Sequence, residues 1–296
     1  MKKKLTFYWS VLQTAFAGFV EHNATRMSAS LSYYTLFSLA PMLLTIIALT
    51  SIFVGQDAVE GQVYGQIKGL LGSDAAKQIQ DIIKNTQQSG QSGWAAVVGS
   101  VTLLIGATGT FAEMQDAINL IWGLKPKPRN GIVSYLITRL LSFSLIVSLG
   151  FLLLVSLGVN ALLNAFSERA EALFSEATFY IFWGLNIFVV WSVIALLFAI
   201  IFKVLPDGKI GWKEALVGAG FTSLLFMLGK YGIGLYLGQS SVGSAYGAAG
   251  SVVLILLWVY YSALILYFGA EFTKAYTELT GKHIVPNELT LQPTTS

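Results

Sequence analysis

The chain has 296 residues, of which 55% are hydrophobic and only 11% charged, with a mean hydropathy of +0.67. Soluble domains carry about 25% charged residues, so this composition excludes an ordinary soluble domain and indicates a polytopic membrane protein. The sequence has no cysteine, which excludes disulfides and thiolate metal sites, and its two histidines are far apart in sequence. We therefore expect no metal site and no cofactor.

The N-terminal segment combines a basic start with an amphipathic pattern. Residues 2–4 are lysines, and apolar residues at helical spacing follow over residues 5–20. This pattern predicts a helix that lies in the membrane interface. A signal peptide is the alternative, because a basic start, an apolar stretch and the Ala-Phe-Ala sequence at 15–17 match its three regions. The polar residues at 13–14 interrupt the apolar centre and argue against it.

Six long apolar runs follow, each long enough for a helix to cross the roughly 30 Å hydrocarbon core of a bilayer. We therefore expect an all-α fold, with a single six-helix transmembrane domain over residues 1–283 and a polar C-terminal tail over residues 284–296. The predicted spans cover residues 28–54, 94–122, 132–166, 177–202, 213–237 and 246–272.

A proline, a glycine and a polar segment add detail to the predicted arrangement of six spans. Pro41, near the middle of the first span, removes a backbone donor and crowds the Phe37 carbonyl, which predicts a kinked or opened helix. Gly123 is expected to end the second span. The polar segment 55–93 contains two short amphipathic pieces, which predict a small helical hairpin that caps one membrane surface.

The distribution of lysine and arginine predicts the orientation in the membrane. Six spans place both chain ends on the same side. If that side is the inside, the outer segments contain only Lys68, Lys77, Lys84 and Arg169, and the other basic loop residues lie inside. The positive-inside rule therefore predicts cytoplasmic termini and an extracytoplasmic hairpin at 55–93.

Polar residues gather near the inner ends of several predicted spans. Carboxylates within a membrane span are costly in contact with lipid and are expected to face protein. Counted at 1.5 Å per residue from the ends of the second and third spans, Asp116 and Arg139 lie at the same depth, which predicts an ion pair between them. The cluster can be a structural set of ion pairs that fixes helix packing, or a polar vestibule for an ion or a headgroup. The predicted cytoplasmic-side polar cluster comprises Glu113, Asp116, Asn119, Arg139, Glu271 and Arg26.

Lys230 is the basic residue predicted to lie in the outer half of a span. One interpretation is a lysine that extends to the outer interface beside Tyr231 and Tyr236. The other is an anion-binding lysine that faces a crevice lined by small residues of the fifth span. The expected substrate-binding residues are Lys230, Asn160, Asn164 and Asn186.

Four runs of the sequence resemble the YihY/BrkB family of bacterial inner-membrane proteins, which has often been labelled ribonuclease BN. They are RMSASLSYYTLFSLAPMLL (26–44), FAEMQDAINLIWG (111–123), FKVLPDGKIGWKEALVGA (202–219) and YGAAGSVVLILLWVYYSALILYFGAEF (246–272). The resemblance implies six transmembrane helices and a role in the cell envelope, with an amphipathic or lipid substrate. It implies no catalytic residues.

Two functions follow as expectations. Pro41, the glycine-rich fifth span and the intramembrane charges favour a translocation path for an anionic amphipathic or lipid substrate. The alternative is a scaffold that binds envelope proteins through residues 55–93. Membrane lipids are the expected partners in both cases.

The ribonuclease label finds little support in the residues. Hydrolysis of RNA would need paired carboxylates for metal ions or a positioned histidine. Asp207, Glu214, Glu278 and His283 are each isolated in the sequence, and the predicted inner loops are short. We therefore expect no enzymatic activity and no nucleic-acid partner.

Overall fold

The computed structural model describes residues 2–54, 109–126, 176–239, 249–286 and 290–291, together with short pieces between residues 60 and 81. Most of the described residues are helical. The long helices are α1 (Lys2–Glu21), α2 (Ala24–Val54), α7 (Glu176–Val204), α8 (Trp212–Gln239) and α10 (Gly250–Leu279), and residues 109–121 are also helical.

Three of the described helices are long and apolar enough to cross a membrane. Their apolar stretches are Ile187–Val204, Trp212–Ile233 and Val252–Leu279, within α7, α8 and α10. These helices match the predicted fourth, fifth and sixth spans and confirm a mostly helical membrane protein. The third predicted span, the first part of the second and most of the 55–93 hairpin lie outside the described residues, so the count of six stays a prediction.

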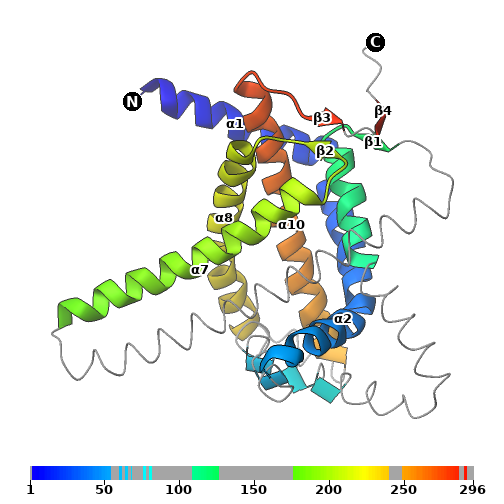
Figure 1. Ribbon diagram of the computed structural model, residues 1–296, viewed down its shortest axis with the longest axis vertical. Coiled ribbons are helices and arrows are strands. Elements are labelled where there is room, and N and C mark those ends of the chain that lie inside the picture. The colour runs from blue at the N-terminus through cyan, green and yellow to red at the C-terminus, as the bar shows by residue number, and fades with distance from the viewer. Residues whose placement is uncertain are drawn as a thin grey trace.

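α10 lies at the centre of the described helices (Figure 1). It packs against α2 and against α8, while α1 packs along its C-terminal part and α7 crosses α8. The main core joins α10 to the 109–121 helix and to the end of α7 through fully buried side chains such as Ile118, Phe202 and Tyr267. Helices distant in sequence are therefore fixed around α10.

α1 is a helix, as its amphipathic pattern predicted, and it is part of the packed structure. Val11 and Ala15 are buried against Phe272 and Tyr276 of α10. A second apolar face of α1, which includes Trp9, remains exposed. One face of α1 is thus covered by protein and another is exposed.

α2 continues through Pro41 as one helix from Ala24 to Val54. Its direction changes toward its C-terminal end, where it turns across the bottom of the molecule in Figure 1. Because α2 is continuous through Pro41, the helix is not opened at the proline.

Two glycines with positive φ end their helices. Gly123 (φ 69°) follows the 109–121 helix, and the Leu124 amide behind it donates to the Asn119 carbonyl. Gly281 (φ 77°) follows α10, where the Lys282 amide donates to the Thr277 carbonyl. Both are Schellman endings, which favour glycine because it adopts this backbone conformation without strain. The predicted end at Gly123 is confirmed.

The C-terminal segment pairs with two turns at one end of the molecule. Strand β3 (Val285–Pro286) is antiparallel to β2 (Gly208–Lys209), which lies between α7 and α8. Strand β4 (Thr290–Leu291) is antiparallel to β1 (Lys125–Pro126), which follows the 109–121 helix. We call this the strand end; Figure 1 shows it at the top, beside α1. The two strands of the predicted tail, β3 and β4, therefore connect the ends of several helices.

Candidate functional site

The turn between α7 and α8 is held by the 109–121 helix. Asn119, which is 2% exposed, donates from Nδ2 to Asp207 Oδ2 over 2.8 Å. The Asp207 amide donates back to Asn119 Oδ1 over 2.8 Å, and Gln115 Nε2 donates to Asp207 Oδ1 over 3.2 Å. Asp207, which is isolated in the sequence, is therefore a structural anchor in the fold.

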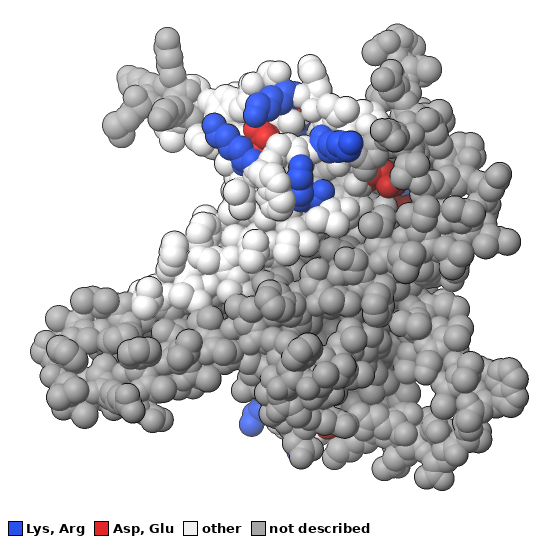
Figure 2. All heavy atoms as spheres, viewed as in Figure 1, with Lys and Arg blue, Asp and Glu red and all other residues white. Residues whose placement is uncertain are grey.

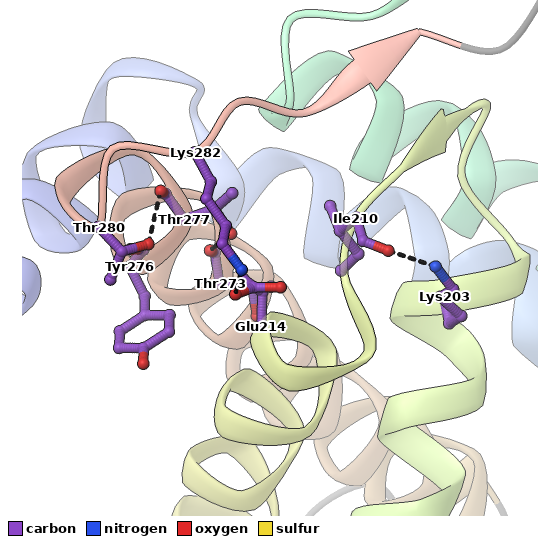
Figure 3. A network of polar contacts seen from close by, with 8 residues as sticks. All are labelled: Lys203, Ile210, Glu214, Thr273, Tyr276, Thr277, Thr280 and Lys282. Carbon is purple, nitrogen blue, oxygen red and sulfur yellow. Dashed lines mark hydrogen bonds and ion pairs between the residues drawn. The ribbon is translucent and has the colours of Figure 1, made fainter.

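A second contact joins the start of α8 to the segment after α10. Lys282 Nζ lies 2.7 Å from Glu214 Oε1, and Glu214 is only 2% exposed (Figure 3). Glu214, isolated in the sequence, thus has a structural partner 68 residues away. Beside this pair, Lys203 Nζ donates to the Ile210 carbonyl and lies 5.6 Å from the centre of the Trp212 ring. Two lysines thus fix the backbone around β2.

Glu271 is held by the turn between α1 and α2. His22 Nδ1 lies 2.6 Å from Glu271 Oε1, and Glu271 is 3% exposed. Gly18 of α1 packs directly on this carboxylate, because a Cβ atom at position 18 would collide with Oε2. Sequence reasoning set His22 aside as an improbable metal ligand and missed its role as a partner for a buried acid.

The predicted cytoplasmic-side polar cluster therefore divides into two parts. Within the described residues, Glu271 pairs with His22, whereas Arg26 is exposed. Asp116 is exposed and lies within electrostatic range of Glu113 and Asp207. Arg139 lies outside the described residues, so its ion pair with Asp116 stays a prediction.

A line of polar side chains enters the apolar core between α2, the 109–121 helix and α10. Tyr267 is completely buried, and within the described part of the chain neither its hydroxyl nor that of buried Thr110 has a hydrogen-bond partner. Glu113 is half-buried and lies within electrostatic range of the Tyr267 phenol, as does Asp116. The buried polar side chains on the facing part of α2 are Ser28, Ser32, Thr35 and Ser38. We call this set the polar seam.

Lys230 lies on the exposed surface of α8. Tyr231 beside it is 66% exposed, whereas Gly229 faces α10 and packs on Tyr261. The described residues do not enclose Lys230, so an anion bound by it would meet it on the outer surface of α8. Asn186 belongs to α7, but its side chain lies outside the described part of the structure, as do Asn160 and Asn164.

Basic side chains gather at the strand end. Figure 2 shows a group of lysine or arginine side chains around this part of the surface. Lys209 and Lys213 are exposed there, beside the start of α8. In contrast, Glu214 points inward to its partner and is buried. Within the described ranges, no group of three or more His, Cys, Asp or Glu side chains could hold a metal ion.

Long apolar helices with charged groups buried between them define a helical integral membrane protein. The chain belongs to the BrkB family: the family model described as Virulence factor BrkB matches residues 15–288. This match confirms the resemblance to the YihY/BrkB family.

Several relatives share only the name UPF0761 membrane protein. The protein from Saccharophagus degradans is 28% identical over 88% of this chain and 58% of its own length. The protein from Rhodospirillum centenum is 27% identical over 90% of this chain and 57% of its own length. The chain thus spans less than two thirds of these relatives, although it covers 92% of a 26% identical protein from Alteromonas mediterranea. No solved structure matches the chain.

Proposed function

We propose that the protein is a translocator for an anionic amphipathic or lipid substrate in the bacterial inner membrane, with six spans and no enzymatic activity. The observation that carries this proposal is the polar seam. Tyr267 and Thr110 bury hydroxyls that have no partner among the described residues, and Glu113 lies within electrostatic range of Tyr267 in the same apolar bundle. Polar and ionisable groups at such positions are costly in membrane proteins and commonly mark transport pathways.

The charge at the strand end supports the proposed orientation. Lys209 and Lys213 are exposed beside Trp212, at the start of an apolar stretch long enough to span the bilayer. Basic residues at the ends of membrane helices favour the cytoplasmic side, so this end and both termini would lie in the cytoplasm. Anionic headgroups would then meet basic side chains at this surface.

Lys230 would meet the substrate at the opposite end of α8. It lies about 26 Å along the helix from Lys213, at 1.5 Å per residue. An exposed lysine at this depth can reach an anionic headgroup of the outer leaflet by extending along the helix surface. The proposal therefore gives α8 basic groups near both membrane surfaces.

Transfer of a fluorescent anionic phospholipid between the leaflets of reconstituted vesicles tests the proposal. We expect the wild-type protein to accelerate transfer over protein-free vesicles, Lys230→Leu to abolish the acceleration, and Lys230→Arg to keep part of it. Lys68→Leu, at an exposed lysine in the predicted hairpin, is the matched control and should behave as wild type. No acceleration by the wild-type protein would overturn the translocator and favour the scaffold.

A further inference from the structure

The polar seam contains two hydroxyl oxygen atoms that find no hydrogen-bond partner among the described residues. They belong to Tyr267, which is 0% exposed, and to Thr110, which is 6% exposed. A buried hydroxyl without a partner costs free energy, because it gives up its bonds to water and gains none. Two such groups in one apolar bundle indicate that something else supplies the missing contacts.

The second observation is the charge that faces these hydroxyls. Glu113 follows Thr110 by three residues on the same helix, which places both on one face. The Glu113 and Asp116 carboxylates both lie within electrostatic range of the Tyr267 phenol, and Asp207 lies within range of Asp116. Among the residues that the structure describes, the charged groups within electrostatic range of Tyr267 are therefore acidic.

Exposure changes in steps along this set of residues. Asp116 is exposed, Glu113 is half-buried, and Tyr267 and Thr110 are buried. Ser38 of α2 lies against Gly109, one helical turn before Glu113, with its Oγ 3.4 Å from where a Cβ atom would lie. A small ion could therefore meet Asp116 first and then lose its water to protein oxygens further in.

We propose that the polar seam is a binding site for a monovalent hard cation, either Na⁺ or a proton. Its ligands are Glu113, Tyr267 and Thr110, and Asp116 forms its entrance. Hard cations prefer oxygen ligands, whereas transition metals favour nitrogen and sulfur. Neighbouring charged groups are engaged elsewhere: Lys274 donates to the Ile121 carbonyl, and Glu271 pairs with His22. This site goes beyond the proposed translocation, because it names an ion that could drive it.

Thermal unfolding of the full chain in detergent tests the site without any transport assay. A ligand that binds only the folded state raises the unfolding midpoint by mass action. We expect NaCl to raise the midpoint of the wild-type protein in a saturable manner, relative to choline chloride at the same ionic strength. If the ligand is a proton, the midpoint should instead rise on acidification in choline chloride.

Three variants locate the site. Tyr267→Phe and Thr110→Val remove only the unsatisfied hydroxyls, so each should abolish the ion-dependent rise without lowering the midpoint in choline chloride. Glu113→Gln should abolish the rise with either ion. Tyr231→Phe, at an exposed tyrosine of α8, is the matched control and should retain it.

Two outcomes would overturn the proposal. One is a wild-type midpoint that depends on neither Na⁺ nor pH, and the other is a rise that all three variants retain. If Tyr267→Phe fails to fold, Thr110→Val and Glu113→Gln still decide the question. Thermal unfolding measures ion binding and not transport. The ion site can therefore be refuted while lipid transfer is observed, and lipid transfer can be absent while the ion binds.

Discussion

Asn119 and Asp207 are joined by two hydrogen bonds of 2.8 Å, one through the Asn119 amide nitrogen and one through the Asp207 backbone amide. The contact connects the end of the 109–121 helix to the turn between α7 and α8. It brings together residues 88 positions apart in the sequence. The buried side-chain amide of Asn119 uses its oxygen and one of its N–H groups in this contact, so it binds both the carboxylate and the backbone of Asp207.

Asn119→Ala should destabilise the protein by about 1–3 kcal/mol, because the Asp207 carboxylate and amide both lose a partner in a half-buried position. Chemical unfolding in detergent, followed by tryptophan fluorescence, measures the change. Gln115→Ala is the comparison, since it removes only the longer 3.2 Å bond and should cost less. Equal costs for the two variants would contradict this ranking.

Lys282→Met should destabilise the protein by about 1–3 kcal/mol, because it leaves the buried Glu214 carboxylate without its partner. Lys282 is itself more than half exposed, which limits the loss. The double variant Glu214→Gln with Lys282→Met should recover part of the stability, since no unpaired charge remains.

Thermal unfolding of the four proteins in this cycle gives the coupling between the two residues. Lys209→Met is the control, because Lys209 is an exposed lysine at the same end of the molecule. Additive effects of the two substitutions would show that the pair contributes nothing to stability.

The helices could be predicted from the sequence because their signals are local. Apolar runs placed α7, α8 and α10 within a few residues of their beginnings, and Gly123 marked the end of its helix. The end of α10 was missed, because the apolar run stops at Phe272 while the helix continues to Leu279. Thr273 and Thr277 donate to carbonyls four residues earlier in this extension, so polar residues continue the helix without unpaired hydroxyls.

The partners within the site could not be predicted in the same way. His22 and Glu271 are 249 residues apart, and their contact depends on how α1 packs across α10. Nothing in the local sequence of either residue indicates that arrangement. The sequence did place Glu113 and Asp116 on one helical face, but their approach to the completely buried Tyr267 depends on how α10 packs against the 109–121 helix.

The proposed orientation predicts the location of reporters fused to the chain. A reporter after Ser296 or within residues 127–130 should report the cytoplasm, and one inserted near Gly90 should report the outside. Each position is tested with two reporters, one active only in the cytoplasm and one active only outside it, so that either location gives a positive signal. A cytoplasmic signal near Gly90 would contradict the six-span topology, and the strand end would then need a new assignment.

Gly229 and Gly232 lie three residues apart on α8 and have different surroundings. A Cβ atom at position 229 would overlap the Tyr261 hydroxyl of α10, whereas one at position 232 would meet nothing within 4 Å. Gly229→Ala should therefore destabilise the protein by about 1–3 kcal/mol, because the packed Tyr261 side chain has to move. Gly232→Ala should be neutral or stabilising by about 0.5–1 kcal/mol, because alanine restricts the unfolded chain more than glycine does.

The same pair tests whether the contact between α8 and α10 matters for Lys230, which follows Gly229 directly. If lipid transfer depends on the position of Lys230, Gly229→Ala should slow transfer in reconstituted vesicles, and Gly232→Ala should leave the rate unchanged. Tyr261→Phe combined with Gly229→Ala should restore part of the lost stability, since it removes the hydroxyl that the new methyl group meets. Equal unfolding midpoints for the two alanine variants would show that α8 and α10 do not pack closely at Gly229.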